Sequence, residues 1–113
     1  MKKLLATLVA VGLAMPIAAL AETWERVTLI DQTCAAKFKA NPDEHTTACA
    51  KKCAKHGLGM LTPDGTWLKL DSAGNKQAIA ALDKTEKKDH VRATVTGEKS
   101  GDVVKVESLK LVD

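Results

Sequence analysis

The sequence predicts a mainly β protein with two short helices, folded as a small OB-like five-stranded barrel. Five short strand-like stretches, separated by turn residues such as Pro-Asp-Gly, follow residue 21. One helical pattern follows the first of these stretches, and a second helical pattern precedes the last two. The resulting order, strand-helix-strand-strand-helix-strand-strand, fits the OB plan with an added helix after the first strand.

The N-terminal residues predict a secretory signal peptide over residues 1–21. A basic start at residues 1–3 precedes a nearly apolar run over residues 4–20, and Ala19-Leu20-Ala21 is a small-x-small cleavage site. We therefore expect cleavage after Ala21, a periplasmic or secreted location, and an OB-like domain over residues 22–113. No later apolar run is long enough to cross a bilayer, so we expect no membrane span in the mature chain.

The composition of the mature chain argues against a nucleic-acid partner. The formal net charge of +3 falls to +1 when Lys2 and Lys3 leave with the signal peptide. The aromatic side chains are only Trp24, Phe38 and Trp67. A nucleic-acid binder needs a basic surface, and a single-strand binder needs a series of stacking rings. So small a domain also buries only a modest core, and an additional covalent or metal constraint would stabilise it.

The first strand is predicted over residues 24–30. Strict alternation places Trp24 and Ile30 on one face of this strand, and Val27 and Leu29 on the other. Both faces thus carry apolar residues, which suits a barrel strand better than an exposed edge strand.

The first helix is predicted from about Pro42 to His56. The asparagine before Pro42 can cap the helix, the glutamate after it completes a capping box, and Gly57 is a terminator. Cys49 and Cys53 are four residues apart on this helix and therefore share one of its faces.

The remaining elements are two hairpins and a short helix. Residues 58–62 and 66–71 flank a Pro-Asp-Gly turn and predict the first hairpin. A helix is predicted over residues 76–83, where Ala78, Ile79 and Leu82 form one apolar face. Residues 90–97 and 103–112 predict the second hairpin, and a shift in its apolar phase predicts a bulge near Glu107-Ser108.

Three cysteines, Cys34, Cys49 and Cys53, are the most informative residues. A pair should oxidise in the compartment that the signal peptide predicts, and an odd number leaves one thiol. On an intact helix the Cβ atoms of Cys49 and Cys53 would be about 5–6 Å apart, wider than the roughly 3.5–4.5 Å of a disulfide. We therefore expect a disulfide from Cys34, placed in a loop, to one of the helix cysteines. The leftover thiol would permit a disulfide-linked dimer.

A soft-metal site is the second interpretation of the same residues. Thiolates at positions i and i+4 form a bidentate clip for Cu(I) or Zn(II), with Cys34 as a third ligand and His45 or His56 as a fourth. His45 and Cys53 would be about 12 Å apart along a straight helix, so both can bind one ion only if the first turn is unwound. His56 has a simpler role as a cation at the helix end. A redox-active or partner-linking thiol is the third interpretation.

The cysteine spacing also carries a resemblance. The chain reads Ile30-Asp31-Gln32-Thr33-Cys34, then Cys49-x3-Cys53 and Gly57, with an Asp-Gly hairpin and two β stretches at residues 91–97 and 101–109. This resembles a family of small secreted bacterial proteins of unknown function, over nearly all of the mature chain. The family pattern is I-S-D-x-x-C-G-x-x-H, followed by C-x-x-x-C-x-x-x-G. The resemblance implies a small OB-like barrel and no established activity. Phe38 stands where the family has its histidine, so a ligand role of that histidine would be absent here.

The sequence lacks the usual catalytic motifs. It contains no His-Glu-x-x-His, no Gly-rich phosphate loop, no Cys-x-x-Cys pair and no recognisable Ser-His-Asp set. We therefore expect a secreted or periplasmic, non-enzymatic binding or envelope-stress module with an unknown ligand or protein partner and mainly structural cysteines. The alternative is a soft-metal binding protein that uses the cysteine helix.

Overall fold

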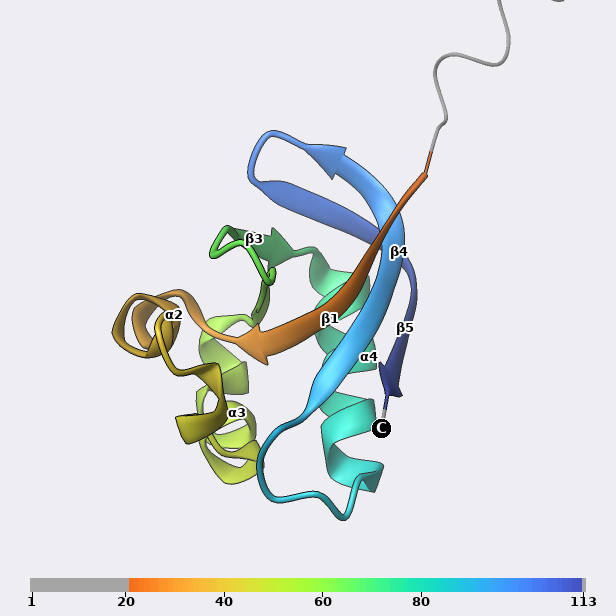
Figure 1. Ribbon diagram of the computed structural model, residues 1–113. Coiled ribbons are helices and arrows are strands. Elements are labelled where there is room, and N and C mark those ends of the chain that lie inside the picture. Colours follow the sequence, from red (N-terminus) through yellow and green to blue (C-terminus); the bar gives the residue numbers. More distant parts are fainter. Residues whose placement is uncertain (1–20, 113) are drawn as a thin grey trace, which may run out of the picture.

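Five strands close into a barrel in the computed structural model, which describes residues 21–112 (Figure 1). The order around the barrel is β1-β2-β3-β5-β4, and β3 and β5 are the one parallel pair among these strands. The strands are β1 (Glu22–Ile30), β2 (Gly59–Leu61), β3 (Trp67–Leu70), β4 (Arg92–Ser100) and β5 (Val103–Val112). The five-stranded barrel confirms the predicted mainly β class. The predicted signal peptide lies outside the described residues, apart from Ala21.

Three α-helices and two 3-10 turns accompany the barrel in the described part of the chain. The helices are α2 (Gln32–Phe38), α3 (Thr47–Cys53) and α4 (Ser72–Lys84), and the turns are η2 (Pro42–Glu44) and η3 (Ala54–His56). The helix α4 packs against β5, while α2 and α3 lie beyond the C-terminal end of β1 (Figure 1). None of the helices over residues 21–112 has the length and apolarity to cross a membrane.

The sequence predicted two helices and placed Cys34 in a loop, and both predictions were wrong. Cys34 lies in an additional helix, α2. The Asp31 side chain caps α2 by accepting a hydrogen bond from the Cys34 backbone N–H at 3.4 Å. Ala35 is buried and packs with Ile30 and Leu61. A helix of seven residues with one buried position shows no helical periodicity, so its sequence alone does not reveal it.

The predicted helix over residues 42–56 is divided. Pro42–Glu44 is a 3-10 turn, His45 is extended, and α3 begins only at Thr47. The Thr46 hydroxyl caps α3 by accepting from the Cys49 backbone N–H at 3.2 Å. The Thr47 N–H and hydroxyl donate to the backbone carbonyls of the loop before β4, at 2.8 and 2.7 Å. Because these tertiary bonds use the Thr47 N–H, one continuous helix cannot form through it.

A bulge in β1 changes the predicted faces of that strand. Trp24 pairs with Val95 and Val27 pairs with Ala93, so β1 holds one extra residue between these pairs. Arg26 lies in this interval with a φ of 55°. As a result Trp24, Val27 and Leu29 all contact the main core, although strict alternation had separated Trp24 from the other two.

The bulge predicted in the last strand is confirmed. Thr96 pairs with Ser108 and Gly97 pairs with Val106, which leaves Glu107 as the extra residue of β5. Gly97 is needed at this point because an added Cβ would lie 2.2 Å from the Lys105 carbonyl oxygen.

The helix α4 begins four residues before its predicted start. The Asp71 side chain accepts from the Gly74 N–H at 2.9 Å and from the Val106 N–H at 3.2 Å, so it joins the helix start to β5. The predicted apolar face is confirmed, because Ala78 and Leu82 are buried and Ile79 packs against the same core.

Candidate functional site

Two of the three cysteines lie side by side where α2 meets α3. Cys34 belongs to α2, Cys53 is the last residue of α3, and Asp31 directly precedes α2. The ligand atoms of these residues, a carboxylate oxygen and two Sγ atoms, lie within 4.8 Å of one another. Asp31 is buried and the two cysteines are half-buried. The fold thus assembles a carboxylate and two thiols from segments that the sequence separates.

The metal clip of Cys49 and Cys53, named in the second interpretation of the sequence, is not part of this set. Cys49 is exposed, although it lies one helical turn before Cys53. His56 is also exposed, on the turn η3 after the helix. Among residues 21–112 the close set of ligand atoms contains neither of them. Asp31, which the sequence analysis did not single out, takes the place given to Cys49.

His45 is buried beside the set but does not belong to it. Its relative exposure is 5%, and its ring lies 5.5 Å from the Phe38 ring, centroid to centroid. His45 precedes α3 in extended backbone, so the first turn of the predicted helix is unwound, as a ligand role of His45 required. The His45 Nε2 atom is buried without a hydrogen-bond partner among the described residues.

The electrostatics of the set keep the Cys34 thiol neutral. Burial raises the pKa of Cys34 to about 12, and the neighbouring Asp31 carboxylate and Cys53 act in the same direction. Burial also raises the pKa of Asp31, but the thiol and backbone N–H of Cys34 that face the carboxylate leave this pKa below its ordinary value. Burial lowers the pKa of His45 against the charge of Asp31. A cysteine nucleophile needs a lowered pKa, so this arrangement does not favour thiol catalysis at Cys34.

The Asp31 carboxylate is incompletely hydrogen-bonded. Its Oδ2 atom accepts from the Cys34 N–H, while Oδ1 is buried without a partner among the described residues. A buried carboxylate oxygen without a partner is unfavourable, and native proteins usually supply a partner for such an atom. The set can therefore do two things chemically: the two thiols can join in a disulfide, or the thiolates and Asp31 can hold a cation.

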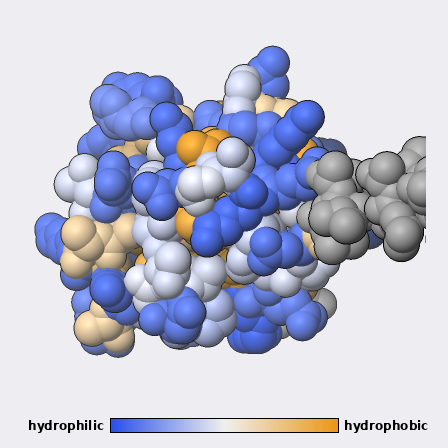
Figure 2. Space-filling view, turned by 90° about the horizontal axis from the view of Figure 1, so that it is seen from above, coloured by the Kyte–Doolittle hydropathy of each residue, from blue (hydrophilic) through white to orange (hydrophobic). Residues whose placement is uncertain are grey.

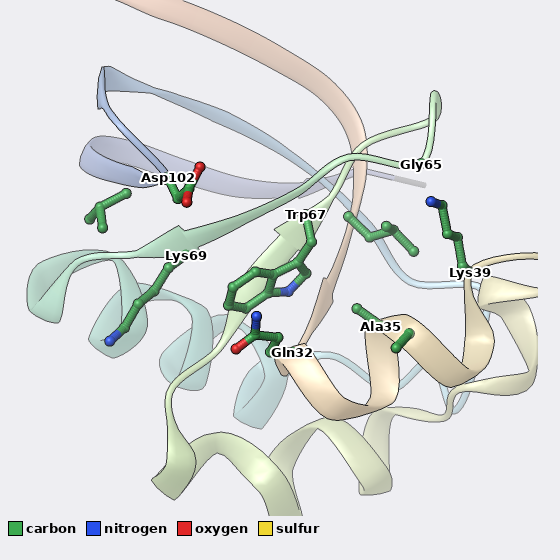
Figure 3. Close-up of a pocket in the computed structure, with 10 residues that line it drawn as sticks. Gln32, Ala35, Lys39, Gly65, Trp67, Lys69 and Asp102 are labelled. Atoms are coloured by element: carbon green, nitrogen blue, oxygen red, sulfur yellow. The ribbon is translucent and has the colours of Figure 1, made fainter.

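A groove of about 530 Å³ lies between α2 and the β2–β3 hairpin. Trp67 is half-buried in its floor and donates its indole N–H to the Ile30 carbonyl at 2.9 Å. Lys39 and Lys69 stand at opposite ends of the groove with Trp67 between them (Figure 3). Asp102, on the turn between β4 and β5, also lines it. The indole ring packs directly over Gly59, which has no side chain. An added Cβ at Gly59 would lie 2.3 Å from the ring.

The face of the molecule seen in Figure 2 is mostly hydrophilic. Figure 2 shows one face on which apolar residues form small patches within a polar surround. Among the described residues the only exposed large hydrophobic side chain is Val103, at 38%, and it lines the same groove. The groove therefore includes the one large hydrophobic side chain that is exposed in the described part of the chain.

Sequence reasoning missed Asp31 and the groove for different reasons. Asp31 is a helix-capping residue type three positions before Cys34, and this spacing was an available signal for α2. The hairpin that brings Trp67 over Gly59 was predicted from its turn, but the packing of α2 beside it, which forms the other side of the groove, has no local signal. No family model, no curated protein and no solved structure matches the chain.

Proposed function

We propose that the mature protein is a small periplasmic or secreted, non-enzymatic binding module on an OB-like barrel, in which Cys34 and Cys53 join α2 to α3. The observation that carries the proposal is the proximity of the two Sγ atoms, within 4.8 Å. A disulfide requires an S–S distance of about 2.05 Å, so bond formation needs the two Sγ atoms to approach each other further. The secretory signal in the sequence supports an oxidising compartment, where such a pair forms a bond.

The closed order β1-β2-β3-β5-β4 supports the OB-like assignment. Small OB barrels bind ligands on the face of strands 2 and 3 and with the loops after strands 1 and 4. The groove beside Trp67 lies on the corresponding face, between α2, which follows β1, and the turn that follows β4. The three-cysteine spacing, which resembles that of small secreted bacterial proteins, supports placing the chain among them.

The proposed disulfide between Cys34 and Cys53, called the staple here, is tested by mass spectrometry. The protein is purified from the periplasm without reductant and alkylated before digestion. We expect a cross-linked peptide pair containing Cys34 and Cys53, and alkylation at Cys49, which is exposed. A Cys49→Ser control should keep the cross-link and lose the alkylated site. A cross-link that includes Cys49, or three alkylated thiols, would contradict the staple.

The groove is tested with a peptide array of defined composition. Lys39 and Lys69 favour acidic side chains at the two ends, and Trp67 favours an apolar group between them. We expect bound peptides to combine these features and Lys69→Glu to abolish their binding. The matched control is Lys105→Glu, which changes an exposed β5 lysine outside the groove and should leave binding unchanged. Equal loss in both variants would show that only overall charge matters and would overturn the assignment.

A soft-metal binding protein is the second candidate function. The specific observation in its favour is the presence of Asp31 beside the two thiols, because a simple disulfide needs no carboxylate. Its ligand set is developed below.

A further inference from the structure

We propose that in the reduced protein Asp31, Cys34 and Cys53 form a Zn(II) site, with Cys49 outside it. This inference deepens the soft-metal candidate and does not depend on the groove. It differs from the sequence expectation, which paired Cys49 with Cys53 as a clip. Three features support a zinc site: the donor types, the size of the set and the unpartnered carboxylate oxygen.

The donor types select zinc. Thiolates favour Cu(I) and Zn(II), whereas carboxylates favour hard ions such as Mg²⁺ and Ca²⁺. Among these ions zinc accepts both thiolate and carboxylate ligands in protein sites. A Cu(I) site would use the two thiols and leave the buried Oδ1 atom of Asp31 without a partner. The buried Asp31 carboxylate, within 4.8 Å of both Sγ atoms, therefore favours Zn(II).

The size of the set fits one ion after a small contraction. Zn–S bonds of about 2.3 Å at a tetrahedral angle place two sulfur atoms roughly 3.8 Å apart. The three ligand atoms lie within 4.8 Å of one another without an ion, so shifts of about 1 Å or less bring them to bonding distance. Three protein ligands leave the fourth tetrahedral position for a solvent molecule or a small ligand.

The unpartnered oxygen is an independent observation. Asp31 has a relative exposure of 7%, and its buried Oδ1 atom has no hydrogen-bond partner among the described residues. A bound cation would supply the missing partner. The other oxygen, Oδ2, accepts from the Cys34 N–H and would orient the carboxylate toward the two sulfur atoms. Zinc binding releases the protons of both thiols, so metal and thiolate charges balance in the bound state.

Zinc titration of the reduced protein under anaerobic conditions, with a chromogenic chelator as competitor, tests the site. We expect one equivalent of Zn(II) per chain. Co(II) in place of zinc should give the visible bands of a tetrahedral ion and a thiolate-to-cobalt charge-transfer band. The absence of stoichiometric binding, or an octahedral Co(II) spectrum, would overturn the proposal.

The same helix provides a matched pair of variants. Cys53→Ser should abolish stoichiometric zinc binding, whereas Cys49→Ser, one turn earlier on α3, should leave the affinity unchanged. An equal loss of zinc affinity in both variants would indicate that Cys49 and Cys53 bind the ion together, and it would refute the assigned set.

Asp31→Asn distinguishes zinc from an ion held by the thiols alone. Asparagine is a good N-cap, so α2 should keep its start while the site loses its carboxylate. We expect the zinc affinity to fall by about tenfold or more, with an unchanged circular dichroism spectrum. An unchanged affinity would mean that Asp31 is no ligand and would refute the site. Failure of zinc binding leaves the disulfide map of the oxidised protein unaffected, so the two proposals fail separately.

Discussion

The helix α4 and the pair α2–α3 are held to the barrel in different ways. α4 has 13 residues, and its buried Ala78 and Leu82 belong to the same core as the strands. α2 and α3 have seven residues each and bury only small side chains, while Asp31 and His45 are buried beside them. Apolar burial thus contributes to the attachment of α4 along its length, in addition to the Asp71 hydrogen bonds at its start. The α2–α3 segment is held by caps, by the hydrogen bonds of Thr47 and by these small buried side chains, so we expect a disulfide or an ion to have its largest effect here.

The largest expected effect comes from breaking the apolar attachment of α4. Leu82→Ala removes a side chain with 2% exposure and should lower the free energy of unfolding by about 2–5 kcal/mol. The loss should be the same with and without reductant, because no thiol contributes to this contact. Urea unfolding under both conditions measures it. A loss that appears only in one redox state would show that α4 depends on the cysteine contact.

The next effect concerns the attachment of α2 to α3. In the oxidised protein Cys53→Ser opens a closed loop between residues 34 and 53, and should lower the free energy of unfolding by about 3 kcal/mol. Reductant should remove most of the difference from the parent protein. Cys49→Ser is the control and should match the parent in both redox states. A redox-independent loss in Cys53→Ser would indicate packing rather than a bond.

A smaller effect should distinguish the true helix start from the predicted one. Thr46→Ala removes the cap of α3 and should cost about 1 kcal/mol of folding stability. Asn41→Ala should have almost no effect, because the Asn41 side chain makes no capping hydrogen bond. Equilibrium unfolding of the two variants measures the difference. A larger loss of stability for Asn41→Ala than for Thr46→Ala would support the predicted continuous helix over residues 42–56.

The smallest expected effect is kinetic and leaves stability unchanged. In the reduced, metal-free protein at pH 8, an alkylating reagent should modify Cys49 rapidly and Cys34 slowly. Cys49 is exposed, whereas burial and Asp31 raise the pKa of Cys34 to about 12, so the reactive thiolate of Cys34 is scarce at this pH. The alkylation rate of Cys34 should increase as the pH rises toward that value. At each pH below that value, the rate in Asp31→Asn should be higher than in the parent protein. Site-resolved mass spectrometry gives both rates, and faster alkylation of Cys34 than of Cys49 would contradict this electrostatic description.

The comparison also explains which parts of the fold were predictable. The faces of α4 and β4 follow from periodicity, and the bulge at Glu107 follows from a phase shift within ten residues of β5. The bulge at Arg26 left no such phase shift, because both faces of β1 carry apolar residues. The α2–α3 segment was predicted least well, since its helices are short and the start of α3 depends on a bond from Thr47 to the distant Lys88.

The sequence by itself determined the strand content, the faces of the long helix and the importance of the three cysteines. These features are local, because periodicity, turn residues and residue counts act over a few positions. Only the tertiary structure decided which cysteines meet. Barrel closure brings the end of β1 to the end of α3, so Cys34 and Asp31 face Cys53 while Cys49 turns toward solvent. The helix register limits which thiols share a face, but the placement of two separate helices decides which thiols lie close together.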